Sequence, residues 1–136
     1  MPSSEIIVRQ YYEHLKNRNR AALLALLSPS IRVVYRSQAD QFPWSGEFLG
    51  HDGFDRFLSL LKSHLNVLDA SITHSTATES TVINQCSGRW EYIKSGYVVT
   101  GDMVNVFHIQ DNQISGYEVY ADTAAFMAGL QQDTDI

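Results

Sequence analysis

The feature that most restricts the fold of this chain is the stretch of residues 97–120, which predicts a long β-hairpin. The first strand reads YVVTGDMVNVFHI and is rich in β-branched and aromatic residues. Asp111-Asn112 is a suitable two-residue turn because both residues tolerate positive φ, and the strand pattern resumes from Ile114 to Tyr120. Both faces of this hairpin are largely apolar, so each face is expected to have a cover.

A two-residue turn also decides which residues face each other across the hairpin. Asn105 then faces Glu118, Met103 faces Tyr120, and Phe107 lies on the same side, because side chains alternate with a period of two. The other side carries a second, mainly apolar set, namely Val104, Val106, His108, Ser115, Tyr117 and Val119. One face of the hairpin therefore combines an acid and an amide with apolar side chains.

Two helical patterns open the chain. Ser3 or Ser4 can cap the first, in which apolar residues recur at spacings of three and four. The second begins with Asn19 as its cap and continues to Ser28, where Pro29 ends it. The first helix is therefore expected to have an apolar stripe, and the second is expected to be short.

Two more helices are predicted further along. The third, from about His51 to Leu65, has the clearest helical periodicity in the chain, and Asp122 is the expected N-cap of a last, short helix in DTAAFMAGL. The apolar stripe of the third helix consists of Phe54, Phe57, Leu58, Leu61 and Leu65.

Strands fill most of the remaining sequence. After Ile31–Tyr35 comes a loop with one short strand, and Lys94-Ser95-Gly96 is a hairpin turn. The later strands are expected at about 67–78, 81–93, 97–110 and 114–120. Sequential strands with hairpin links favour an α+β fold, a curved and mostly antiparallel sheet with helices segregated to one face. Such a sheet leaves a cavity between itself and its helices.

Composition and net charge limit the kinds of binding partner that the chain is expected to have. The 136 residues carry a net charge of −5 without a Lys/Arg cluster, which argues against nucleic acid as a partner. No run of ~20 apolar residues suits a membrane span. Cys86 is the only cysteine, so no intrachain disulfide and no thiolate metal site are expected, and the protein is expected to be cytoplasmic. One domain over residues 1–136 is predicted, with an ordered core at about 6–130 and a tail at 131–136.

No metal or cofactor is predicted. The sequence has no glycine-rich phosphate loop and no nucleophile elbow. The histidines show no metal-ligand spacing; they are His14, His51, His64, His74 and His108.

Three stretches, taken together, are similar to a known superfamily. The chain starts helix, helix, strand, continues with FPWSGEFLGHDGFDRFL into the third helix, and closes with EVYADTAAF after a strand hairpin. This order and these motifs resemble the nuclear-transport-factor-2-like superfamily, and within it the SnoaL-like and ketosteroid-isomerase-related branch. The resemblance covers about residues 6–130 and implies a cone-shaped fold with three longer helices on the concave face of the sheet and a short C-terminal helix.

The resemblance also implies a set of catalytic residues. Tyr11 matches the helix-one tyrosine of ketosteroid isomerase, and Asn105 stands where its protonated acid would be, but the matching base position near Tyr35 holds no carboxylate. In polyketide cyclases an aspartate on the last strand faces a histidine, a pair that Glu118 and Asn105 match. Glu118 is therefore the expected general base and Asn105 with Tyr11 the oxyanion donors, acting next to a carbonyl without a cofactor.

A ligand of small, apolar or aromatic carbonyl type is expected in the cavity. Its predicted binding residues are Tyr12, Trp44, Trp90, Met103, Phe107 and Tyr120. An epoxide hydrolase of the limonene type is less favoured, because its Asp-Arg-Asp set has no arginine in DMVNVFH. The superfold hosts isomerases, cyclases and proteins without chemistry, so a non-catalytic ligand-binding or dimerisation module is the alternative.

A homodimer is also predicted. No helix remains to cover the convex face of the sheet, and a contiguous apolar face of that kind usually marks an interface. The residues expected there are Val104, Val106, Tyr117 and Val119.

Overall fold

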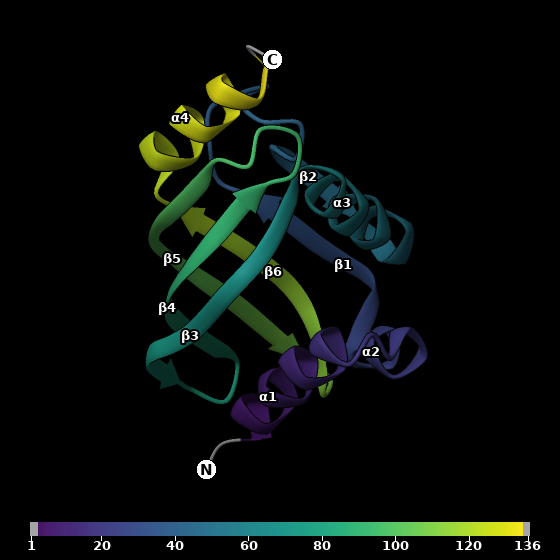
Figure 1. Cartoon of the computed structure of the whole chain (residues 1–136). Helices are drawn as coiled ribbons and strands as arrows, with labels where there is room; N and C mark the ends of the chain where they lie inside the picture. Colours follow the sequence, from purple (N-terminus) through teal and green to yellow (C-terminus); the bar gives the residue numbers. More distant parts are fainter. Residues whose placement is uncertain (1–2, 135–136) are drawn as a thin grey trace.

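Residues 3–134 are described by the computed structural model, in which a six-stranded sheet bends around three helices (Figure 1). In chain order the elements are α1 (Ser3–Lys16), α2 (Arg20–Leu26), β1 (Leu27–Tyr35), β2 (Gly46–Leu49), α3 (Gly50–His64), β3 (Leu65–Ala77), β4 (Thr81–Tyr92), β5 (Val98–Gln110), β6 (Gln113–Ala121) and α4 (Thr123–Thr134). This order agrees with the succession of helices and strands that the sequence predicts.

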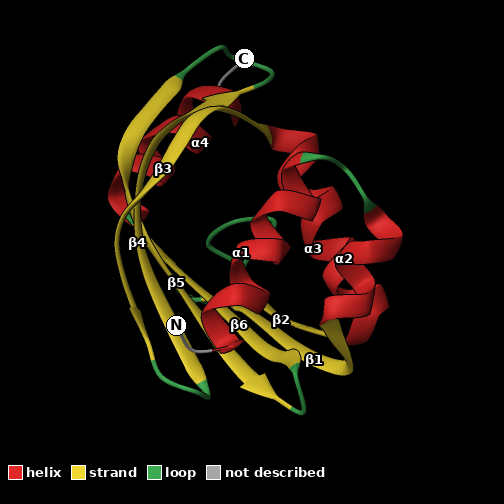
Figure 2. Ribbon diagram, turned by 90° about the horizontal axis from the view of Figure 1, so that it is seen from below, coloured by secondary structure: helices red, strands yellow, loops and turns green. Residues whose placement is uncertain are grey.

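The strands lie in the order β2-β1-β6-β5-β4-β3. All neighbours are antiparallel except β1 and β6, which run parallel. Figure 2 shows the sheet as a strongly curved layer with α1, α2 and α3 inside its curve. The α+β prediction with a mostly antiparallel, curved sheet is therefore confirmed.

Side-chain caps start two of the helices as predicted. The Asn19 side chain accepts a hydrogen bond from the Ala22 amide at 3.3 Å, and the Asp122 carboxylate accepts one from the Ala125 amide at 3.2 Å. Each cap satisfies a backbone N–H that has no partner within its helix.

The boundary after α2 differs from the prediction. The helix ends at Leu26 rather than Ser28, and β1 already begins at Leu27, so Pro29 lies inside a strand. The pairing of β1 with β6 shifts register between Leu27 and Arg32. Proline lacks the N–H that a regular ladder would use, and it is tolerated there because the pairing is interrupted at that point.

The core fills the space between the concave face of the sheet and the helices. Its largest fully buried side chains are Trp44, Tyr11, Tyr92, Phe54, Phe57 and Phe107. At the far end of β4, α4 covers the same face: the Tyr92 hydroxyl donates to the Phe126 carbonyl at 2.7 Å, and the Trp90 and Phe126 ring centroids are 5.4 Å apart. The α1–α3 layer and α4 thus cover opposite ends of the concave face.

Candidate functional site

The register of the β5–β6 hairpin decides which side chains enter the interior. Asp111 and Asn112 form the turn, with φ of 52° and 59°. However, His108 pairs with Gly116 while Ile109 pairs with Ile114, so Ser115 is an additional residue in β6. A bulge of one residue moves every later side chain of its strand to the other face.

The predicted facing pair of Asn105 and Glu118 is therefore wrong. Asn105 lies opposite Val119, and Glu118 lies opposite Val106. Because side chains alternate along a strand, Tyr117 turns inward, where it is buried, while Glu118 points outward.

On the outer face Glu118 is held by two neighbours. Arg36 Nε donates to its carboxylate at 3.0 Å, and His108 Nε2 lies 2.9 Å from the other carboxylate oxygen. These contacts, first that of His108 and then that of Arg36, lower the pKa of Glu118. This geometry gives the carboxylate an ion-pairing environment and no access to the interior.

A polar group of four residues, called the Tyr12 cluster, lies on the concave face instead. It consists of Tyr12 on α1, Asn84 and Cys86 on β4, and Asn105 on β5. Asn84 and Asn105 are direct cross-strand partners, and their side-chain amides donate to the Tyr12 hydroxyl oxygen at 3.3 and 3.0 Å. Asn105 Nδ2 also lies 3.9 Å from the Cys86 sulfur.

The two amides of the Tyr12 cluster are deeply buried. Asn84 is 2% exposed and Asn105 is 4% exposed. The side-chain carbonyl oxygen of each has no hydrogen-bond partner among residues 3–134. Native proteins rarely leave such groups unpaired, because an unsatisfied buried polar atom costs about 1–3 kcal/mol. These oxygens are therefore the strongest indication of a missing polar partner in the interior.

Three aromatic rings pack beside the Tyr12 cluster. Phe107 stacks on Tyr117 with ring centroids 4.8 Å apart, and Tyr11 meets both rings at 5.2 and 5.7 Å. Burial raises the pKa of Tyr11 and of Tyr117 well above 10, and burial likewise raises that of Tyr12 to about 12. These hydroxyls are therefore neutral hydrogen-bonding groups at physiological pH.

The other predicted ligand residues do not form one wall. Trp44 is fully buried and stacks on Phe42 at 5.2 Å, while Trp90 packs on Phe126 beneath α4. Met103 is half-buried on the concave face, since its strand alternates in phase with Asn105. Tyr120 is 44% exposed and points outward, for the same reason as Glu118.

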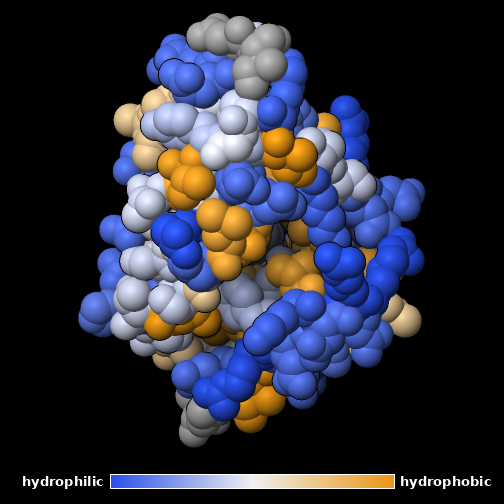
Figure 3. Space-filling model, in the orientation of Figure 1, coloured by the Kyte–Doolittle hydropathy of each residue, from blue (hydrophilic) through white to orange (hydrophobic). Residues whose placement is uncertain are grey.

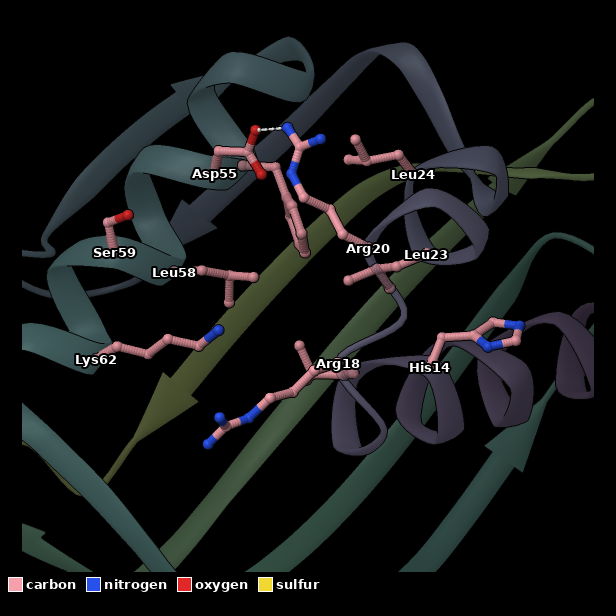
Figure 4. A pocket seen from close by; sticks show the side chains of 11 residues that line it. His14, Arg18, Arg20, Leu23, Leu24, Asp55, Leu58, Ser59 and Lys62 are labelled. Carbon is pink, nitrogen blue, oxygen red and sulfur yellow. Dashed lines mark hydrogen bonds and ion pairs between the residues drawn. The ribbon is translucent and has the colours of Figure 1, made fainter.

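A pocket of ≈ 300 Å³ opens between α1, α2 and α3 (Figure 4). Its apolar wall is formed by Leu15, Leu23, Leu24, Phe54 and Leu58. The Phe54 and Tyr11 ring centroids are 6.2 Å apart, and those of Tyr11 and Tyr12 are 5.4 Å apart, so the Phe54 and Tyr11 rings lie between the pocket and the Tyr12 cluster. Figure 3 shows that the face seen in Figure 1 is hollowed at its centre, with apolar side chains inside and hydrophilic ones around.

Charged side chains surround this pocket. Arg18 and Arg20 come from the junction of α1 and α2, whereas Asp55 and Lys62 come from α3. Arg20 forms an ion pair with Asp55, and Figure 4 shows this pair at one side of the pocket.

Sequence reasoning missed several of these residues. Asn84 lies two positions before Cys86 in the same strand alternation, so its inward direction could have been found. Tyr117 was assigned to the wrong face because the bulge at Ser115 was not foreseen. Arg18 and Lys62 gave no local signal, since only the packing of α1 near α3 brings them to one pocket.

Residues 3–134 contain neither a metal-binding cluster nor a membrane-spanning helix. No group of three or more His, Cys, Asp or Glu side chains is arranged to hold a metal ion. None of the helices in this range has the length and apolar character needed to cross a membrane.

Solved structures with the same fold are numerous. An NTF2-like protein of unknown function from Burkholderia pseudomallei is 20% identical, with 95% of this chain and 98% of that chain covered and a TM-score of 0.83. TerC, co-crystallised with polyporic acid, is 19% identical with coverages of 96% and 99% and a TM-score of 0.81. A proposed isomerase from Bacillus subtilis is 12% identical with coverages of 97% and 97% and a TM-score of 0.78.

Comparison with curated proteins gave no match. The family model of the SnoaL-like domain matches residues 8–117, which span both sides of the pocket and most of the sheet. With the NTF2-like fold of its structural neighbours, this match shows that the chain belongs to the SnoaL-like domain family of the NTF2-like superfamily.

Proposed function

We propose that this protein binds a small, largely apolar carbonyl compound, with hydroxyl groups on its ring system, between the helices and the concave face of the sheet. The observation that carries the proposal is the pair of buried, unpaired side-chain oxygens of Asn84 and Asn105. Each can accept a hydrogen bond from a ligand hydroxyl, and the Asn84 amide, which donates only to Tyr12, keeps a second N–H for a ligand carbonyl.

The surroundings favour a flat ligand. The aromatic rings of Tyr11, Phe107 and Tyr117 pack next to the Tyr12 cluster, and the pocket between α1, α2 and α3 lies on the other side of the Tyr11 and Phe54 rings. Aromatic rings with polar tips suit a planar molecule that carries a few oxygen atoms. The related fold that was co-crystallised with polyporic acid supports small-molecule binding by this architecture.

Ligand binding without proton abstraction fits the geometry better than the isomerase-type or cyclase-type reaction. The titratable groups of the interior named above are Tyr11, Tyr12, Tyr117 and Cys86, and burial raises the pKa of each. A group that stays protonated is a poor general base near neutral pH. The non-catalytic alternative therefore becomes the leading proposal.

The proposal is tested by a thermal-shift screen with hydroxylated aromatic ketones and quinones. A compound that binds raises the Tm of the wild-type protein, because ligands stabilise the folded state by mass action. Asn84→Leu and Asn105→Leu should lose this shift, whereas Asn66→Leu, the same change at an exposed position of β3, should keep it. Equal shifts in all three variants would contradict a role for the Tyr12 cluster.

The predicted homodimer remains a second proposal, through a smaller patch than expected. Tyr117 and Val119 are buried inside and do not contribute. Ile83, Val104 and Tyr120 share the outer face, and Ile83 and Val104 also line a cavity of ≈ 380 Å³. Light scattering of the wild-type protein and of Ile83→Asp at micromolar concentration should give a dimer and a monomer, respectively.

A further inference from the structure

The pocket between α1, α2 and α3 differs in charge from the rest of the chain. The chain as a whole has 10 Lys and Arg against 15 Asp and Glu. The pocket reverses this balance, since Arg18, Arg20 and Lys62 line it with Asp55 as the single carboxylate. A cleft lined by one sign of charge with apolar walls focuses the electrostatic field and attracts ligands of the opposite sign.

Two of these cations are available for a ligand. Arg20 is paired with Asp55, so those two charges largely cancel. Arg18 and Lys62 form no ion pair within residues 3–134. Figure 4 shows both side chains extending, one from the end of α1 and the other from α3, toward the same open space.

The backbone at Arg18 is a second, independent observation. Arg18 has a φ of 56° and follows the end of α1, where its amide bonds to the Leu15 carbonyl at 3.3 Å and the Asn19 amide bonds to the His14 carbonyl at 2.9 Å. This pattern is the helix-ending Schellman motif, whose left-handed residue is usually glycine. An arginine there costs stability, and strained positions of this kind concentrate at functional sites.

We propose that the ligand of this pocket is an organic anion. Its apolar body lies against Leu15, Leu24 and Leu58, which are half-buried lining residues, and its acid group, a carboxylate or sulfonate, is held at the mouth by Arg18 and Lys62. The Arg18 guanidinium can bind such a group through two parallel hydrogen bonds, with Lys62 as a point charge. This inference rests on the proposed function and adds the charge of the ligand to it.

The test uses two fluorescent probes that differ by one acid group. The anion is 1-anilinonaphthalene-8-sulfonate, and its neutral counterpart is N-phenyl-1-naphthylamine. Wild-type protein should bind the anion more tightly. Arg18→Gly and Lys62→Gln should each weaken anion binding by about tenfold, as expected for a lost charge-assisted hydrogen bond, and should leave binding of the neutral probe unchanged.

Matched controls distinguish direct contact with the anionic probe from a general effect of removing one positive charge. Lys16→Gln on α1 and Arg56→Gln on α3 each remove one positive charge from an exposed position that does not line the pocket. Both should keep anion binding within about twofold of wild type, because exposed charges outside the site are screened by salt. Near-ultraviolet circular dichroism checks that Arg18→Gly keeps its fold, which glycine at this position favours.

The outcomes distinguish this inference from the proposed function. Equal affinity for both probes, with no effect of Arg18→Gly, would overturn the anion preference and leave small-molecule binding intact. A loss of similar size in Lys16→Gln would overturn direct contact by Arg18. Failure of both probes to bind, or binding that survives filling of the pocket by Leu58→Trp, would overturn both the inference and the use of this pocket for ligands.

Discussion

Asn84 and Asn105 stand directly opposite each other on β4 and β5, and their side-chain amides donate to one shared acceptor, the Tyr12 hydroxyl oxygen. Two buried polar side chains of the sheet are thereby tied to α1. The arrangement leaves both side-chain carbonyl oxygens unpaired. An incomplete buried network of this kind supports the ligand site that we propose.

Tyr12→Phe should destabilise the fold by about 1–3 kcal/mol, because the two buried amides lose their common acceptor. Urea unfolding followed by circular dichroism measures this loss. Tyr97→Phe, the same change at a residue that is 38% exposed, is the control and should stay within about 0.5 kcal/mol of wild type. Similar stabilities of the two variants would show that the Tyr12 hydroxyl is not a needed acceptor.

Much of the fold follows from local patterns in the sequence. Alternation placed Asn105 and Phe107 on one face of β5, where both are buried. The turn at Asp111 and Asn112 could be predicted because few residues accept positive φ at low cost. The cap at Asp122 could be predicted for a similar reason, since a short acceptor side chain must precede the helix.

Which side chains of β6 point inward could not be predicted, because one additional residue shifts the register of the strand. Ser115 forms the bulge, and its hydroxyl donates to the His108 carbonyl at 3.2 Å. A glycine inside a strand often marks a bulge, whereas a serine does not, so the identity of this residue did not indicate the bulge. The faces of Tyr117, Glu118 and Tyr120 all depended on this single residue.

The candidate site was harder to predict than the fold. The Tyr12 cluster joins α1 to β4 and β5, and the hydrogen bonds from Asn84 and Asn105 to Tyr12 span 72 and 93 positions of the chain. Arg18 and Lys62 likewise meet only after α1 has packed near α3. Contacts of this range are set by tertiary packing, which strand and helix periodicities do not encode residue by residue.

The pH dependence of stability should change in Glu118→Gln. His108 and Arg36 hold the pKa of Glu118 below its ordinary value of 4.5, so the ionised group stabilises the fold above that pH. This contribution is lost as the pH falls from about 4.5 through the lower, folded-state pKa. Urea unfolding at pH 7 and at pH 3–4 should therefore show a smaller acid-induced loss in the variant than in wild type.

A second variant tests the cause of that effect. His108→Gln removes the contact that lowers the pKa of Glu118 most, so its acid-induced loss should lie between those of wild type and Glu118→Gln. An acid-induced loss in Glu118→Gln as large as that in wild type would mean that this ion pair does not contribute to stability.

Gly129→Ala should destabilise the protein even though alanine is the better helix former. A Cβ at Gly129 would overlap the Tyr92 ring and press on Val99, so α4 could no longer sit close to the sheet. Helix propensity alone would give a gain of about 1 kcal/mol, whereas overpacking costs typically 1–3 kcal/mol. We expect a net loss in urea unfolding, and a net gain would show that α4 has room to shift.

Arg18→Gly should raise the free energy of unfolding by about 0.5–1 kcal/mol. The left-handed conformation costs an arginine about 1–2 kcal/mol, and glycine avoids this cost but loses about 0.5–1 kcal/mol through its larger freedom in the unfolded chain. Lys16→Gly, two residues earlier and at the last position of α1, should instead lower the free energy of unfolding, by at most the roughly 1 kcal/mol that glycine costs in a helix interior. Chemical denaturation of both variants checks the opposite signs.

A loss of stability in both variants would remove the backbone argument for Arg18. A gain in Arg18→Gly together with weaker binding of the anionic probe would mean that one substitution improves the fold and impairs the pocket. Residues that lower stability while serving a site are a recurrent form of the trade-off between stability and function. A gain in stability with unchanged anion binding would mean that ligand binding does not explain the strained backbone of Arg18.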